Sequence, residues 1–187
     1  MSRGPLIIVS GPSGSGKSTV IGRLLARGQW PLHLSVSATT RAPRPGEIHG
    51  VHYYFWTREH FDEEVKAGAF LEWADVHGNH YGTLRREVEG PRERGQGVIL
   101  DIDVQGAEQV RKQCPDAVSV FLKTSSWPTY EERLRRRGSE DEASIQRRLA
   151  AARRELERAG EYDHQVLNDN LDDAVAQLGR IVRQSFQ

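Results

Sequence analysis

The sequence of 187 residues has one cysteine, no excess of charge and no long apolar run, and each absence excludes a class of protein. With Cys114 alone, the chain cannot form an internal disulfide, which is typical of a reducing compartment. The 26 basic and 26 acidic side chains give a formal net charge of zero, which disfavours a surface that coats nucleic acid or an anionic membrane. No apolar run approaches the roughly 18 residues that a membrane-spanning helix requires. We therefore expect a cytoplasmic protein without membrane or nucleic-acid partners.

Apolar runs alternate with helical patterns along most of the chain, which predicts βα units and a mainly parallel sheet. The run PLIIVS at 5–10 is short and continuous, as expected for a strand buried on both faces of such a sheet. Further strands are expected at 97–103, 117–123 and 164–168, and helices at 16–27, 103–113, 127–137, 140–159 and 171–185. The length suits one α/β core with small insertions.

The segment 35–83 departs from this pattern. Short alternating stretches with glycine-containing turns predict a small mixed or antiparallel sheet there, interrupted by a helix near 58–67. A second, helical insertion is expected at 125–147, where an Arg-rich helix passes through RGSEDE into the next helix. The expected core is therefore residues 1–34, 84–124 and 148–187.

The segment GPSGSGKS at 11–18 matches the phosphate-binding loop pattern G-x-x-x-x-G-K-[ST] in full. It follows a predicted strand and opens a predicted helix, where backbone N–H groups and the helix N-terminus attract phosphate. Lys17 would reach the β- and γ-phosphates, and the Ser18 hydroxyl would bind Mg²⁺. This pattern predicts a nucleoside triphosphate site, but it does not identify the phosphoryl acceptor.

The segment TTRAPRPGE at 39–47 places Arg41 and Arg44 three residues apart between prolines. Prolines favour an extended backbone that repeats about every three residues, so the two guanidinium groups would point roughly the same way. Paired guanidinium groups suit a phosphate dianion. A basic, solvated loop is the simpler alternative from these residues alone.

Two interpretations of the sequence differ in what accepts the phosphoryl group. DVQG at 103–106 fits the D-x-x-G pattern of GTPases, but the guanine-reading N-K-x-D pattern is absent from the sequence. A nucleotide kinase uses more of the chain, since it needs a triphosphate site, a monophosphate site and bridging cations. Guanine has two adjacent hydrogen-bond donors, N1–H and N2–H₂, and a carboxylate such as Glu72 could accept hydrogen bonds from both. Hydroxyl groups could donate to its O6 atom. An exposed strand position for Glu72 remains an alternative.

Other basic and histidine-rich segments suggest less. RLRRRG at 133–138 could contact nucleic acid, but it has no stacking aromatics beside it and reads as a solvated face. The seven histidines have no accompanying cysteines or credible ligand set, so no structural metal is expected. In RRLAAARRELERA at 147–159, the charges other than Arg148 are expected to face solvent.

Over nearly its full length the chain resembles guanylate kinases. The resemblance rests on GPSGSGKST (11–19), SVSATTRAPRPGEIHGVHYYF (35–55), FLEWADVHGNHYGT (70–83), ILDIDVQG (99–106), RLRRRG (133–138), RRLAAARRE (147–155) and VLNDNLDDA (166–174). It implies a three-layer P-loop α/β fold with a GMP-binding insertion at 35–83 and a helical lid at 125–147. It also implies ATP-dependent conversion of GMP to GDP, with dGMP as a further substrate and Mg²⁺ as cofactor.

The resemblance assigns roles by position. The ATP-binding set is Gly11, Pro12, Ser13, Gly14, Ser15, Gly16, Lys17, Ser18, Thr19, Arg133, Arg137 and Asn168. The GMP-binding set is Ser37, Arg41, Arg44, Tyr53, Glu72, Tyr81, Thr83 and Asp103. The expected catalytic cations are Lys17, Arg44, Arg137 and Arg148, and Mg²⁺ is expected at Ser18 and, through water, at Asp101.

The sequence departs from the family pattern at several positions, including extra histidines in EIHG and VHGNHYG. KTSSWP at 123–128 replaces a segment that usually has two prolines, and Asn170 in NDN stands where the family usually has an aspartate. Two alternatives to a guanylate kinase remain. One is a related P-loop kinase that acts on another small phosphate ester, and the other is a non-catalytic, kinase-like binding module.

Overall fold

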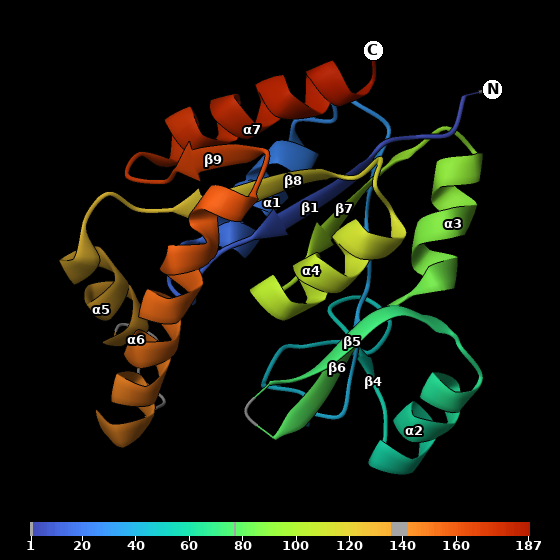
Figure 1. Cartoon of the computed structure of the whole chain (residues 1–187), viewed down its shortest axis with the longest axis horizontal. Helices are drawn as coiled ribbons and strands as arrows, with labels where there is room; N and C mark the ends of the chain where they lie inside the picture. The colour runs from blue at the N-terminus through green and yellow to red at the C-terminus, as the bar shows by residue number, and fades with distance from the viewer. Residues whose placement is uncertain (1, 77, 136–141) are drawn as a thin grey trace. The chain divides into compact units, whose positions relative to one another are not determined.

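The computed structural model describes residues 2–76, 78–135 and 142–187 of the chain (Figure 1). It divides into two compact units. The P-loop unit comprises Ile7–Trp30, Asp101–Val104 and Val118–Gln187. The mixed-sheet unit comprises Met1–Leu6, Pro31–Leu100 and Gln105–Ala117.

A five-stranded sheet has the strand order β2-β7-β1-β8-β9. Its strands are β1 (Leu6–Ser10), β2 (Leu32–Leu34), β7 (Gly97–Asp101), β8 (Val118–Lys123) and β9 (His164–Leu167). The pairs β1–β8, β2–β7 and β8–β9 are parallel, which confirms the predicted α/β class. All five residues of β1 are buried, as its continuous apolar run predicts. The strand β2 pairs with β7 in this sheet and lies within residues 1–34, the first segment of the core expected from the sequence.

The P-loop unit contains the helices α1 (Lys17–Ala26), α5 (Trp127–Arg135), α6 (Glu142–Glu157) and α7 (Leu171–Ser185), and a short 3-10 helix at Arg158–Glu161. The helix α7 lies along β9 and also contacts α1 (Figure 1). A buried cluster joins α5 to α6 through Tyr130, Leu134, Ile145 and Leu149. These elements confirm the helices expected from the hydrophobic pattern.

The mixed-sheet unit has a four-stranded sheet in the order β4-β3-β6-β5. Its strands are β3 (Ala38–Thr39), β4 (Tyr54–Phe55), β5 (Phe70–Val76) and β6 (Asn79–Leu84). The β3–β4 pair is parallel and the other two pairs are antiparallel, so the sheet is mixed. Helix α2 (Arg58–Lys66) packs Phe61 into a buried cluster with Ala38, Phe70 and Leu84.

Two more helices belong to this unit, α3 (Arg85–Glu93) and, from Gln105 onward, α4 (Val104–Gln113). The sequence pattern predicts α4, but α3 is missed. Its Gly90-Pro91 pair reads locally as a break, whereas Pro91 lies inside the observed helix. Burial of Val88, Pro91 and Arg92 on one side of α3 outweighs that local preference.

Side-chain caps explain where two helices begin. The Thr57 hydroxyl accepts a hydrogen bond from the His60 N–H at 3.2 Å at the start of α2. At the start of α7, the Asn170 side-chain oxygen accepts from the N–H groups of Asp172 and Asp173, at 2.9 and 3.2 Å. Asparagine is a strong N-cap residue, so the departure at position 170 retains a structural function.

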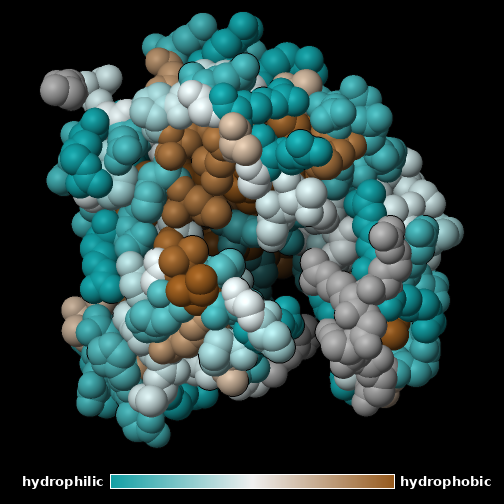
Figure 2. Space-filling model, turned by 180° about the vertical axis from the view of Figure 1, so that it is seen from behind, coloured by the Kyte–Doolittle hydropathy of each residue, from teal (hydrophilic) through white to brown (hydrophobic). Residues whose placement is uncertain are grey.

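The surface is mostly hydrophilic on the face shown in Figure 2, with separate groups of hydrophobic residues between the polar ones. The large hydrophobic side chains that are exposed are Leu34, Ile48, Val51, Trp73 and Leu167. Across the described ranges, helices are too short or too polar to cross a membrane.

Candidate functional site

The phosphate-binding loop lies between β1 and α1, as its sequence pattern predicts. Gly11 and Gly16 have positive φ angles of 142° and 89°, a backbone region that side chains rarely adopt. A Cβ atom at Gly11 would lie 2.1 Å from the Leu122 carbonyl oxygen, and one at Gly16 would lie 2.3 Å from Asn168 Nδ2. The conformation and the close approach therefore both require glycine at these positions.

Lys17 and Ser18 occupy the first turn of α1. Lys17 Nζ donates a hydrogen bond to the Gly11 carbonyl across the loop. Ser18 Oγ donates to Asp101 Oδ2 at 3.0 Å, so the two predicted magnesium residues are in direct contact. Hydroxyl and carboxylate oxygens are ligands that Mg²⁺ prefers, and it usually takes its other ligands from phosphate and water. The pair therefore fits a magnesium site that substrate completes, and the described residues include no cluster of three metal-binding side chains.

Arg133 and Asn168 surround the outer turn of the loop. The Arg133 guanidinium donates to the carbonyls of Gly14 and Ser15, both at 3.3 Å, and to that of Asn168 at 3.0 Å. Asn168 Nδ2 donates to the Ser15 carbonyl at 2.7 Å, and its side chain is buried. These bonds stabilise the loop conformation and place both residues beside it.

Glu155 lies among charged residues of the same unit. The Glu155 carboxyl group on α6 is mostly buried, and burial raises its pKa to about 7. The charge of Asp103 raises this pKa further, whereas Lys17 and Arg148 oppose the shift. Arg148 and Glu155 are seven residues apart, on one face of α6. The expectation that only Arg148 on this helix faces inward is therefore wrong for Glu155.

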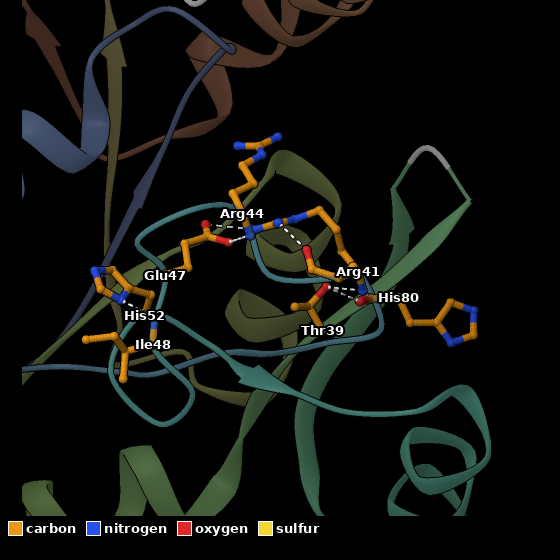
Figure 3. Close-up of polar contacts among 8 residues, drawn as sticks. Thr39, Arg41, Arg44, Glu47, Ile48, His52 and His80 are labelled. Carbon is orange, nitrogen blue, oxygen red and sulfur yellow. Dashed lines mark hydrogen bonds and ion pairs between the residues drawn. The ribbon is translucent and has the colours of Figure 1, made fainter. Parts of the chain in front are cut away.

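In the mixed-sheet unit, the segment 39–47 forms a compact group around Arg41 (Figure 3). Arg41 Nη2 donates to Glu47 Oε1 at 2.9 Å, and the backbone N–H of Arg44 donates to Glu47 Oε2 at 2.7 Å. The pKa of Glu47 is lowered, chiefly by the hydrogen bond from Arg41. The Thr39 hydroxyl accepts from the Arg41 N–H at 3.1 Å and donates to the His80 carbonyl at 2.9 Å.

Aromatic rings surround the Arg41 guanidinium. It lies 5.6 Å from the ring centre of Tyr53 and 5.8 Å from that of Phe55. Tyr53 and Tyr81 are in edge contact with their centroids 6.0 Å apart, and the pKa of Arg41 is raised chiefly by its hydrogen bond with Glu47 and further by Tyr81. Three residues of the predicted GMP-binding set are thus adjacent. The Arg44 side chain instead extends from the loop into solvent (Figure 3).

Glu72 and Thr83 form a buried pair on neighbouring strands. They are opposite each other in the register of β5 and β6. Thr83 Oγ1 donates to Glu72 Oε1 at 2.7 Å, and the two residues are 0% and 5% exposed respectively. The exposed-strand alternative for Glu72 is therefore excluded.

Other members of the predicted sets belong to one unit or the other, and one lies outside the described residues. Ser37 lies next to β3, where its carbonyl accepts from the Tyr54 N–H at 2.9 Å. Asp103 and Arg148 belong to the P-loop unit, near Glu155. Arg137 lies outside the described residues.

Sequence reasoning missed Glu47, Thr39 and Glu155. A carboxylate three residues after Arg44 was a local signal for Glu47. Arg148 and Glu155 are seven residues apart, a spacing that puts both on one face of α6 and could have indicated Glu155. Thr39 could not be assigned from the sequence, because its partner His80 is 41 residues away.

Comparison with known proteins agrees with this geometry. The family model described as "Guanylate kinase" matches residues 3–185. The chain is 50% identical to a guanylate kinase of Synechococcus sp. (strain JA-3-3Ab) over 177 residues, which cover 95% of this chain and 81% of the relative. It is 47% identical to a guanylate kinase of Fusobacterium nucleatum subsp. nucleatum over 182 residues, which cover 97% of each chain.

Solved structures give the same result. The crystal structure of guanylate kinase from Anaplasma phagocytophilum matches with a TM-score of 0.82 and 32% identity, covering 100% of this chain and 88% of that one. The structure of TT1252 from Thermus thermophilus matches with a TM-score of 0.57 at 15% identity, a likeness of fold alone. From the phosphate loop, the buried Glu72–Thr83 pair and these matches, we conclude that the chain belongs to the guanylate kinase family.

Proposed function

We propose that this chain transfers the γ-phosphoryl group of Mg·ATP to GMP, and to dGMP, by in-line displacement. ATP binds at the phosphate loop of the P-loop unit, with Arg133 and Asn168 beside the loop. GMP binds to the mixed-sheet unit, with its phosphate at Arg41, Arg44, Tyr53 and Tyr81. Membership of the guanylate kinase family supports the reaction. The cytoplasmic location expected from the sequence belongs to this proposal.

The buried Glu72–Thr83 pair carries the assignment of the base. The Glu72 carboxylate accepts from Thr83 Oγ1, and a carboxylate, as an acceptor-only group with two oxygens, suits the adjacent N1–H and N2–H₂ donors of guanine. Adenine would bring the N1 lone pair against the same carboxylate. A site whose buried polar groups are left unpaired by the wrong ligand discriminates by roughly 10⁴-fold or more.

The Arg41–Glu47 pair suggests how the phosphate is bound. Arg41 is held over Tyr53 and Phe55 by Glu47 before any phosphate binds, so little side-chain entropy remains to be lost. A guanidinium group and phenolic hydroxyls can each donate to phosphate oxygens. Arg44, which extends from the loop, is then available to the phosphoryl group in transfer.

The chain's residues act on the transferred group through charge and position. Lys17, Arg44, Arg137 and Arg148 would neutralise charge as two anionic substrates approach each other. Ser18 and, through water, Asp101 would hold Mg²⁺, which would add charge neutralisation on the triphosphate. No general base is needed, because the acceptor phosphate is ionised near neutral pH.

A coupled ADP-release assay with Mg·ATP and each of GMP, dGMP, AMP, CMP and UMP tests the proposal. Turnover with GMP and dGMP alone is the expected result. If no monophosphate is phosphorylated by a folded protein that binds ATP, the proposal is wrong. A related kinase for another phosphate ester, or a binding module, would then take its place.

A further inference from the structure

Strand β5, which carries Glu72, is interrupted by a β-bulge immediately before that residue. Phe70 lies opposite Leu84 and Glu72 lies opposite Thr83, so two steps along β5 match one step along β6. In a regular ladder, Leu71 would lie opposite Thr83. Since neighbouring residues of a strand point to opposite faces, the bulge determines that a carboxylate rather than an apolar chain meets the Thr83 hydroxyl.

The bulge lies on the edge strand of its sheet. The order β4-β3-β6-β5 leaves one side of β5 without a neighbouring strand. Carbonyl groups on an open edge need partners from elsewhere, and an unsupported edge strand can change its register. The position of Glu72 therefore depends on what holds this edge.

Two glutamines of α4 contact the edge on either side of Glu72. Gln113 Nε2 donates to the Leu71 carbonyl at 2.7 Å, and Gln109 Nε2 donates to the Trp73 carbonyl at 2.9 Å. Carbonyls two residues apart on a strand point the same way, and side chains four apart on a helix share a face. The spacings of helix and strand therefore match, and both bonds form within the mixed-sheet unit.

Arg85 determines the orientation of the Gln113 amide. Arg85 Nη2 donates to Gln113 Oε1 at 2.9 Å, so the amide nitrogen of Gln113 faces the Leu71 carbonyl. Arg85 Nε also donates to the Gly68 carbonyl at 3.2 Å, which lies just before β5. An oxygen engaged by a guanidinium group leaves only the NH₂ group for the strand, which fixes the amide assignment.

We propose that Gln109 and Gln113 are positioning residues for guanine recognition, which hold the bulge that places Glu72 opposite Thr83. The proposal rests on the proposed function of Glu72. The glutamines do not contact the base, and they act through the backbone of residues 71–73. Their loss lets the edge of β5 move, so that Glu72 meets the base less well while the phosphate loop is unaffected.

Methionine variants test this, because methionine has the length of glutamine without a hydrogen-bond donor. In Q109M/Q113M, we expect the Kd for GMP, measured by calorimetry without ATP, to rise about 3- to 10-fold, since each net hydrogen bond contributes modestly. The KM for GMP should rise equally, the KM for ATP should stay within twofold, and the preference for GMP over AMP should fall. The matched control is Q184M, which changes an exposed glutamine on α7 and should leave all constants unchanged.

A rescue variant separates positioning from general stability. Q109M should weaken GMP binding, whereas Q109K, which restores a donor of similar length, should return the Kd toward the wild-type value. Unchanged GMP binding in Q109M/Q113M would overturn the proposal, as would equal rises in the KM for GMP and for ATP. The wild-type enzyme is titrated with GMP first. If it fails to bind GMP, the proposed function fails, whereas normal wild-type binding with unaffected variants removes only the role of the glutamines.

Discussion

At the scale of single residues, two cations expected to bind phosphate are bonded to oxygen atoms of the protein itself. Lys17 Nζ donates to the Gly11 carbonyl, and the Arg41 guanidinium donates to Glu47 and to the Ala42 carbonyl. These partners hold each cation in a defined conformation, so binding a phosphate there would require less ordering. Arg44 differs, because its side chain has no hydrogen bond or ion pair with any of the residues that the structure describes.

Replacing Arg44 by methionine should affect catalysis more than ATP binding. The Arg44 side chain is exposed, and the hydrogen bond between Arg44 and Glu47 involves only the backbone N–H of Arg44. The fold should therefore tolerate Arg44→Met. We expect kcat to fall about 100-fold or more, since charge stabilisation of a transferring phosphoryl group is a large contribution. Steady-state kinetics and ATP titration measure this, with Arg58→Met on α2 as an exposed control. Wild-type turnover by Arg44→Met would remove Arg44 from the mechanism.

Glu155 makes the stability of the chain depend on pH. Its pKa is about 7 in the folded protein, compared with 4.5 for an unperturbed glutamate side chain. Below pH 4.5 the carboxyl group is protonated in both states, and no penalty arises. Between 4.5 and about 7 the unfolded chain loses the proton while the folded chain retains it, so unfolding becomes more favourable as pH rises. Above that range the penalty is constant.

Glu155→Gln should therefore stabilise the nucleotide-free protein at high pH only. The gain in free energy of unfolding should be near zero at pH 4.5 and about 1–3 kcal/mol at pH 8. Urea unfolding at several pH values measures it, with Glu157→Gln on the exposed side of α6 as the control. An equal effect of Glu155→Gln at both pH values would contradict the buried environment assigned to this carboxyl group.

At the scale of elements, the β5–β6 pair combines a bulge with a close approach. A Cβ atom on Gly82 would lie 2.6 Å from the Phe70 ring and 2.9 Å from the Glu72 carbonyl oxygen. Phe70 is itself stacked on Phe61, with centroids 4.5 Å apart, so the ring has little room to move. The strands can pair here only because position 82 has no side chain.

Gly82→Ala should consequently disturb the four-stranded sheet that is proposed to bind GMP. We expect a loss of about 1–3 kcal/mol in the free energy of unfolding, as for other overpacked positions, together with weaker GMP binding. Gly22→Ala in α1 is the matched control, because nothing lies within 4 Å of its added Cβ and helices favour alanine. Denaturant unfolding and GMP titration provide the comparison. Normal stability and GMP affinity in Gly82→Ala would show that β5 and β6 separate more easily than the contacts indicate.

At the scale of the whole molecule, the residues proposed to bind ATP belong to the P-loop unit, and most of those proposed to bind GMP belong to the mixed-sheet unit. Removing divalent cations from this chain should affect catalysis but not folding. The oxygens of Ser18 and Asp101 that are proposed to bind Mg²⁺ would need substrate to complete a site, and among the described residues no three His, Cys, Asp or Glu side chains are grouped to hold a metal ion. EDTA should therefore abolish ADP release while the thermal midpoint of the substrate-free protein stays within about 1 °C. A large fall in that midpoint would reveal a structural metal.

Much of this protein follows from local sequence. The phosphate loop, the buried run of β1 and most helices are determined by interactions between residues close in the chain, so motif and periodicity predict them. The TTRAPRPGE segment likewise indicates Arg41 and Arg44 as candidates for phosphate binding. Their individual environments depend on Glu47, which accepts from the guanidinium group of Arg41 but only from the backbone of Arg44. Division into a core and two insertions stays a prediction from the sequence.

The tertiary structure decided the features that depend on distant partners. Packing of Val88, Pro91 and Arg92 maintains α3 through a glycine-proline pair, and β2 joins the parallel sheet because β7 pairs with it. The pKa of Glu155 depends on burial and on charges far away in the chain. Glu72 meets Thr83 through a one-residue bulge, which no local pattern predicts because it arises from the pairing of two strands.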